Sequence, residues 1–271
     1  DHQHIVTIFQ AAIASDGRPY LVMEYCPGAT LSERYKAGSI PVRDVVSMGI
    51  QLAGAVETAH RFRILHRDIK PANVLTTRSG RPALTDFGIS VATGSVSETV
   101  GMSIPWSPPE MLTESPDGDQ RADIYSLAAT LYTLLARRSP YERPGGPNTG
   151  IDLATRIQRT QLPALARPDV PASLERVLAR GLAKSAAGRW ASALQFSRAL
   201  QDVQEEQHWP ITEAEVFDEN PEAAIADLGP EDDGRTRIRG LTIIAAQAPA
   251  EDTGRRRVAP PPSARPGSAW A

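Results

Sequence analysis

The chain has 271 residues, of which 41% are hydrophobic and 23% charged, as in ordinary globular proteins that bury a sizeable core. Its formal net charge of −3 gives no reason to expect nucleic-acid binding. Cys26 is the only cysteine, which excludes an intramolecular disulfide and favours a reducing compartment. No apolar run approaches the roughly 18 residues of a membrane span. We therefore expect a cytoplasmic protein, or the cytoplasmic part of a membrane-anchored parent.

The first elements predicted along the chain are a β-hairpin and a long helix. The β-rich runs 5–12 and 19–25 flank the turn signal SDGR, which is typical of a hairpin. From Pro41 to about Arg63, apolar residues recur at helical spacing. The runs VLTT and PALT around RSGR predict a second small hairpin, and the hydroxyl-rich stretch 89–105 predicts a loop.

The rest of the chain predicts three more helices and a tail. The helices lie near 122–136, 173–183 and 192–203, and Ser173 and Ser192 are plausible N-caps for the last two. Beyond Gln204 the sequence turns acidic, then rich in arginine and proline, and its apolar content is too thin to offset chain entropy. Residues 205–271 are therefore predicted to be a disordered tail. The order of strands and helices ahead of it predicts an α+β fold.

One short stretch, HRDIKPAN (66–73), concentrates charged and polar side chains, and the tripeptide DFG follows at 86–88. HRD, the Asn five residues later and DFG together fix seven residue types. Such a set arises by chance roughly once in 10⁹ starting positions, taking each type as about one in twenty. Taken singly, Asp68 could be a turn residue, Asn73 a local cap and Asp86 a strand-end acid. The intact spacing of all three favours a functional interpretation.

With these motifs the chain resembles the protein kinases, specifically the bacterial serine/threonine kinases of eukaryotic (Hanks) type. Further similar stretches extend the resemblance over about residues 1–204: HQHIV (2–6), LVMEYCPGATL (21–31), SPPE (107–110), DIYSL (123–127) and GRWASA (188–193). The resemblance implies that residues 1–26 are a partial N-lobe, with its last two strands and the start of the hinge. Residues 27–204 would form a mainly α-helical C-lobe.

The resemblance also implies a site for phosphoryl transfer, in which the protein mainly positions reactants and neutralises charge. Asp68 would accept or orient the proton of the attacking hydroxyl. Lys70 would lie against the γ-phosphate of ATP, although a lone loop lysine is usually just solvated. Asn73 and Asp86 would hold Mg²⁺, for which hard oxygen ligands are suited.

The adenine of ATP would be bound near the hinge in the same resemblance. The Glu24 carbonyl and the Cys26 N–H would meet the base, with Met23 as gatekeeper, and Leu75 would lie under it. The hinge contacts are backbone roles, so side-chain identity says little about them, and a strand leucine is more often plain core.

Two further pairs implied by the resemblance are architectural. Asp123 would bind the backbone of the His66–Arg67 turn, and Arg189 would pair with Glu110. Both support the fold more than the chemistry.

The sequence departs from the family pattern at two places. No GxGxxG occurs, and no lysine precedes Lys36, so the phosphate loop and the lysine that contacts the α- and β-phosphates are missing. The chain thus resembles a kinase cut just ahead of its fourth strand, which we expect to be a poor kinase alone. In the substrate loop, Ser103 and Trp106 replace the usual Thr and Tyr. Ser103 keeps a hydroxyl that could bond Asp68.

Three functions stay open on this basis. The first is an ATP- and Mg²⁺-dependent kinase of serine and threonine hydroxyls in protein substrates. The second is a catalytically silent, kinase-like scaffold or binding module. A sugar or antibiotic kinase of related fold is a distant third, since SPPE and the hydroxyl-rich loop favour protein substrates.

Overall fold

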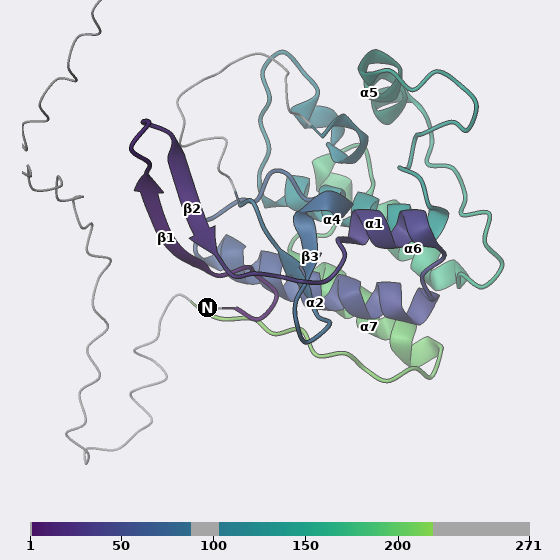
Figure 1. Cartoon of the computed structure of the whole chain (residues 1–271). Helices are drawn as coiled ribbons and strands as arrows, with labels where there is room; N and C mark the ends of the chain where they lie inside the picture. The colour runs from purple at the N-terminus through teal and green to yellow at the C-terminus, as the bar shows by residue number, and fades with distance from the viewer. Residues whose placement is uncertain (1, 88–102, 219–271) are drawn as a thin grey trace, which may run out of the picture. The chain divides into compact units, whose positions relative to one another are not determined.

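The computed structural model describes residues 2–87 and 103–218, and they form a helix-rich α+β unit (Figure 1). The predicted loop at 89–105 falls mostly outside these residues. The elements in chain order are β1 Ile8–Ile13, β2 Pro19–Met23, α1 Leu31–Ala37, α2 Val42–Arg61, β3 Val74–Thr76, β4 Pro82–Leu84, α4 Gln120–Ala136, α5 Gly150–Arg159, α6 Ala172–Gly181 and α7 Ala193–Glu206. Short 3-10 turns add η1 Pro71–Asn73, η2 Ile104–Trp106, η3 Pro109–Met111 and η4 Ala186–Gly188. Within the described ranges no helix is long and apolar enough to cross a membrane.

The predicted first hairpin is confirmed as the antiparallel pair β1–β2. Its turn closes with a bond from the Ala14 N–H to the Arg18 carbonyl at 2.8 Å, and Gly17 supplies the left-handed backbone (φ 84°) that the turn requires. The hairpin projects from the helices (Figure 1), and it leaves large apolar side chains in solvent, with Phe9 63% and Ile13 72% exposed. A two-stranded sheet with so little cover is marginal by itself, so its attachment to the helical part must hold it.

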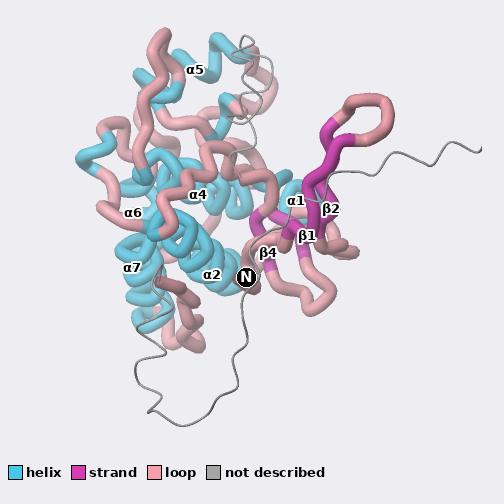
Figure 2. Tube along the Cα trace, turned by 90° about the vertical axis from the view of Figure 1, so that its left-hand side faces the viewer, coloured by secondary structure: helices cyan, strands magenta, loops and turns pink. Residues whose placement is uncertain are grey.

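The core lies in the helical part, where α2 packs against α4 and α7 (Figure 2). The predicted long helix is confirmed as α2, whose apolar positions, such as Val45 and Leu52, are fully buried. Helix α4 is buried on nearly every side, including Ile124 and Leu131, as expected for a helix that is hydrophobic all round. The second predicted hairpin is confirmed as β3–β4.

Helices α1 and α5 were not predicted, and the predicted N-cap Ser173 is wrong. Helices α1 and α5 are short, but each begins with a capping box, in which Thr30 or Thr149 exchanges bonds with an acid three residues later. Ser192 caps α7 as predicted, by accepting from the Gln195 N–H at 3.2 Å. Ser173 does not cap α6, because that helix already begins at Ala172 and encloses the serine in its first turn.

Residues 207–218, here called the C-terminal strap, turn back along α2 instead of leaving the domain. The side chain of Gln204, in the last turn of α7, accepts from the Thr212 N–H at 2.8 Å and donates to the Thr212 hydroxyl at 2.9 Å. That hydroxyl donates to Ser47 Oγ of α2 at 3.0 Å. Trp209 packs against the core. The side-chain amide of one glutamine therefore fixes the direction of the strap.

The end of the strap lies against α2 and the beginning of the chain. The Phe217 N–H donates to Thr58 Oγ1 at 3.1 Å, and His2 Nε2 bonds the Glu215 carbonyl at 3.0 Å. At Gly54 a Cβ would come within 2.4 Å of the Glu215 carbonyl oxygen, so glycine is needed for this approach. The sequence predicted disorder from residue 205, whereas residues 205–218 are packed and hydrogen-bonded. The predicted tail at 219–271 lies outside the described residues.

Candidate active site

Hydrogen bonds to Asp123, in the first turn of α4, fix the HRD turn. Its carboxylate accepts from the His66 N–H at 2.9 Å and the Arg67 N–H at 2.7 Å, as the resemblance implied. Arg67 adopts a left-handed conformation (φ 65°), which is uncommon for a residue with a side chain and needs such support. His60 Nε2 of α2 also contacts Asp123 Oδ2, at 2.8 Å. No role was predicted for His60 from the sequence, so this contact was missed.

Three of the predicted site residues meet directly after this turn. Lys70 Nζ donates to Asp68 Oδ2 at 2.7 Å, and Asn73 Nδ2 donates to the same oxygen and to the Asp68 carbonyl, both at 3.0 Å. These bonds fix the Asp68 carboxylate in one orientation. Pro71 is the first residue of η1. Its ring fixes its own φ angle, which favours the tight turn that brings Asn73 close to Asp68. A carboxylate held in this way, and still partly exposed, can accept a proton from a hydroxyl.

The serine of the substrate loop approaches the catalytic loop through Lys70. Ser103 Oγ accepts from Lys70 Nζ at 2.7 Å, so the lysine bridges Ser103 and Asp68. The Ser103 hydroxyl, which could have bonded Asp68, thus reaches it only through Lys70. Trp106 lacks the hydroxyl of the usual tyrosine, but its indole N–H donates to Thr133 Oγ1 of α4 at 3.0 Å. The loop thus keeps two polar anchors despite both replacements.

Asp86 follows β4 along the chain. The Thr85 N–H donates to the Asn73 carbonyl at 3.0 Å, which brings the DFG segment next to the catalytic loop. Asp86 has a left-handed backbone (φ 65°) and an exposed side chain. Phe87 packs its ring 4.4 Å from that of His66. Burial lowers the pKa of His66 below its ordinary value, which favours a neutral ring against Phe87.

The donor set at this place fits a magnesium ion that is shared with phosphates. Asn73 uses its amide nitrogen toward Asp68, which leaves its carbonyl oxygen available, and Asp86 presents a carboxylate. Among the described residues no group of three or more His, Cys, Asp or Glu side chains could hold a metal alone. Mg²⁺ is commonly bound by one or two protein oxygens, with phosphates and water completing its shell. The two predicted ligands are therefore compatible with it.

The predicted adenine contacts lie on the segment that follows β2. The Glu24 N–H donates to the Thr7 carbonyl oxygen at 2.8 Å. Within residues 2–87 and 103–218, no backbone hydrogen bond involves the Glu24 carbonyl or the Cys26 N–H. Leu75 lies half-buried in β3, opposite Ala83. The Cys26 thiol is half-buried, and desolvation, with the nearby Glu24 charge, raises its pKa. These groups can therefore face a base as expected, while the thiol itself stays protonated.

A large apolar cavity of about 670 Å³ separates the hairpin from the helical part. Its walls include Met23 of β2, Ala59 of α2, Phe62 just after that helix, Asp86 and Phe87. The sequence of the hairpin contains neither a glycine-rich loop nor a lysine that could face the site. The side of the site contributed by α2, β4 and the catalytic loop is consequently more complete than the side contributed by β1 and β2.

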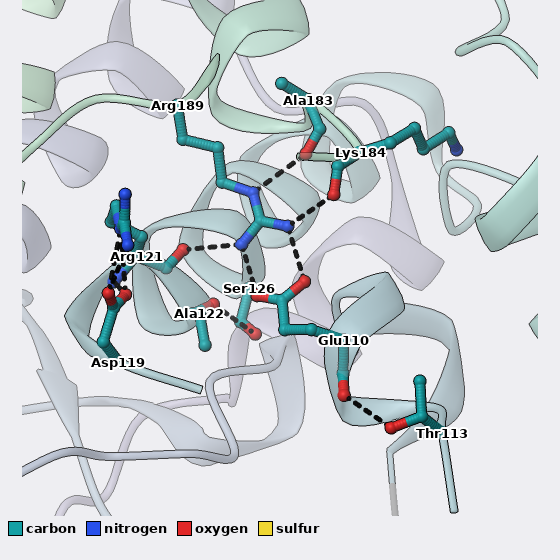
Figure 3. A network of polar contacts seen from close by, with 9 residues as sticks. All are labelled: Glu110, Thr113, Asp119, Arg121, Ala122, Ser126, Ala183, Lys184 and Arg189. Atoms are coloured by element: carbon teal, nitrogen blue, oxygen red, sulfur yellow. Dashed lines mark hydrogen bonds and ion pairs between the residues drawn. The ribbon is translucent and has the colours of Figure 1, made fainter. Parts of the chain in front are cut away.

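The SPPE segment is fixed to the far helices by one buried ion pair (Figure 3). Arg189 donates to the two carboxylate oxygens of Glu110 at 2.6 and 2.7 Å, as implied by the resemblance. Its remaining N–H groups reach the carbonyls of Ala183, Arg121 and Lys184 at 2.8, 3.1 and 3.1 Å. The guanidinium is fully buried and fully hydrogen-bonded, which is the condition under which a buried charge is tolerated.

Comparison with known proteins agrees with this geometry. The protein kinase domain family matches residues 1–200. The serine/threonine-protein kinase PknK of Mycobacterium bovis is 38% identical over 207 residues, 75% of this chain and 18% of that protein. Pkn1 of Myxococcus xanthus is 33% identical over 98% of this chain and 40% of its own length, and PrkC of Bacillus subtilis is 32% identical over 71% and 30%. The chain thus spans less than half of the length of these relatives. Its sequence, its fold and this site together place the chain in the protein kinase family.

Proposed function

We propose that this chain is the catalytic portion of a protein kinase that transfers the γ-phosphate of ATP to serine and threonine hydroxyls of proteins. The observation that carries the proposal is the cluster of Asp68, Lys70 and Asn73 around one carboxylate oxygen, with Asp86 next to it. The names of the relatives support the same reaction. A carboxylate, an ammonium and two oxygen ligands are the groups that phosphoryl transfer requires from a protein.

In the proposed reaction each side chain has a separate task. Asp68 accepts or orients the proton of the substrate hydroxyl, and the two bonds from Asn73 and Lys70 hold it in position. Lys70 donates to a γ-phosphate oxygen as charge develops there. The Asn73 amide oxygen and the Asp86 carboxylate hold Mg²⁺, which when bound would neutralise charge on the phosphates. The backbone of Glu24 and Cys26 binds the adenine, and Leu75 covers its face.

The proposal includes the partners and the location of the protein. The substrates are proteins and the nucleotide is ATP, whereas nucleic acid is not a partner, in line with the net charge of −3. A cytoplasmic position, free or as part of a membrane-anchored parent, is supported by the single cysteine.

The test uses a version of the protein with a complete N-lobe, because the 271 residues alone are expected to be a poor kinase. It compares the wild-type sequence with Asp68→Asn and with the control Asp202→Asn, whose side chain lies exposed on α7. Phosphate transfer to a serine-containing protein and ATP binding are measured for each. Loss of a general base typically lowers the rate about 10²–10⁴-fold, so Asp68→Asn should lose transfer but keep ATP binding. Near-normal turnover of Asp68→Asn would show that Asp68 does not have this role.

A silent scaffold is the second candidate, and one observation favours it. Within the 271 residues there is no GxGxxG and no lysine ahead of Lys36, so two family groups that bind the triphosphate are missing. Loss of even one preorganised electrostatic contact commonly costs about 10²–10³ in rate. Wild-type chain that binds a protein partner but transfers no phosphate would favour this candidate.

A further inference from the structure

A second concave site lies between the end of α1 and the turn that follows α4. This cleft of about 520 Å³ is bordered by three basic side chains, Lys36, Arg137 and Arg138. Glu142 is the acid on its border, and Tyr35, Ala136 and Pro144 supply its apolar wall. The cleft contains none of the residues assigned to phosphoryl transfer.

The basic side chains of the cleft are not neutralised by the fold. None of the three forms an ion pair with another described residue. The Glu142 carboxylate accepts from the Ser139 N–H and from the Ser139 hydroxyl, both at 3.2 Å, so it is directed toward its own turn. Three cations and one acid leave the cleft with an excess of positive charge.

The cleft is rigid because Arg137 joins its two walls. This residue ends α4 in a left-handed conformation (φ 59°). Its guanidinium crosses to α1 and donates to the carbonyls of Tyr35 and Lys36, both at 3.0 Å. The end of α1 therefore cannot move away from the end of α4 without loss of these bonds. The positions from which Lys36 and Arg138 extend are fixed in the same way.

The cleft is connected to the place where a substrate hydroxyl would react. The Arg137 N–H donates to the Thr133 carbonyl at 2.8 Å, and the Thr133 side chain holds Trp106 of the substrate loop. One helical turn, about 5.4 Å, thus separates the cleft from the residue that anchors this loop. On its other wall, α1 packs against η1, the turn that carries Asn73. A peptide bound near Ser103 could extend into the cleft without a long detour.

We propose that this cleft binds an acidic segment of the protein substrate, next to the residue that is phosphorylated. The proposal rests on the proposed function, because it assigns a substrate preference to the same chain. An extended peptide suits the cleft better than a single small anion does. Tight binding of one phosphate needs several donors that converge, but Arg137 spends two of its N–H groups on carbonyls, and Lys36 is exposed on α1.

The expected strength follows from the exposure of the charges. An exposed ion pair changes affinity about 1.5- to 5-fold. Reversal of one basic residue removes one attraction and adds one repulsion, so it should weaken binding of an acidic peptide about 3- to 20-fold. The effect should shrink as salt is raised, since the charges are screened within about 10 Å at 0.1 M ionic strength.

The test measures binding by fluorescence anisotropy with the full 271-residue chain. The probe is a labelled peptide with one serine and a run of five glutamates, and its control has glutamines in place of the glutamates. Lys36→Glu and Arg138→Glu are compared with Arg198→Glu, a reversal of an exposed arginine on α7. Arg137 is left intact because its bonds hold the cleft together. Circular dichroism confirms that each variant is folded, and Lys36→Gln serves as a milder second variant.

The proposal predicts weaker binding of the acidic peptide to both cleft variants, and little change for Arg198→Glu or for the glutamine peptide. Equal loss in all three reversals would indicate a non-specific charge effect, and unchanged binding in the cleft variants would place the acidic segment elsewhere. Either result would overturn the proposal, as would full competition by inorganic phosphate at the concentration of the peptide. The assay contains no ATP, so it measures binding of the acidic peptide separately from phosphate transfer. The 271 residues alone are expected to transfer phosphate poorly, so peptide binding without transfer would leave this proposal intact. The proposed function alone would be refuted if a version with a complete N-lobe bound the peptide and still transferred no phosphate.

Discussion

Glu110→Gln tests how strongly the buried ion pair holds the SPPE segment in place. Arg189 is fully buried and directs two of its five hydrogen bonds at the Glu110 carboxylate, which is 24% exposed at its side chain. The glutamine keeps one acceptor but removes the negative charge, so the guanidinium charge stays buried with neutral partners. Breaking a buried pair in this way costs about 3–5 kcal/mol. The partial exposure of Glu110 favours the lower end, about 3 kcal/mol.

The assay is urea denaturation of the full chain, followed by circular dichroism, together with a thermal melt. At about 2–4 °C per kcal/mol for a domain of this size, the melting temperature should fall by about 6–12 °C. Asp119→Asn is the matched control, because it breaks the exposed pair with Arg121 on the same face and should change stability much less (Figure 3). In a double-mutant cycle with Arg189→Met, the two losses should be strongly non-additive. A loss below about 1 kcal/mol in Glu110→Gln would refute the reasoning.

Three further predictions concern the strap, the first residues and the hinge. Gly54→Ala should displace the strap, because the new Cβ would lie 2.4 Å from the Glu215 carbonyl, and faster amide exchange at 212–217 would show it. Burial lowers the pKa of His4, which bonds the Pro82 carbonyl. The neutral His4 ring therefore contributes its full stabilisation above pH 6.5, the ordinary histidine pKa, and this stabilisation is lost as the pH falls toward the lowered pKa of the folded state. The difference between the melting temperatures at pH 7.5 and pH 5.5 should be smaller in His4→Gln than in the wild-type chain. The raised pKa of Cys26 predicts slower alkylation at pH 8 than for a free thiol, and equal rates would contradict it.

Much of the fold follows from patterns that act over many residues. The apolar period of α2 and the all-round hydrophobicity of α4 predicted two central helices, since burial of such surfaces dominates helix stability in proteins. The motif spacing brought Asp68 and Asn73 together as expected, and their chemical roles stay predictions. Asp123 and Arg189 were placed by the resemblance, and both bonds are present.

The features that the sequence did not predict depend on few residues or on loop geometry. The strap has little apolar content, and its direction depends on the side chain of Gln204, which no periodic pattern reveals. Helices α1 and α5 are too short for a clear period, although their capping boxes could have indicated them. The place of Lys70 between Asp68 and Ser103 depends on the path of two loops in space. Motif spacing within one loop carries no information on that path.

The strap also brings the two ends of the described chain together. His2 and Glu215 are 213 residues apart in sequence but share a hydrogen bond of 3.0 Å, and the ring centroids of His2 and Phe217 lie 5.3 Å apart. Because the ends meet, a short linker could join residue 218 to residue 2 with little cost in loop closure. New ends could then be opened in the exposed turn between β1 and β2, at residues 14–18, where few contacts would be lost. The connectivity of this fold is therefore open to circular permutation, with the catalytic loop left unbroken inside the rearranged chain.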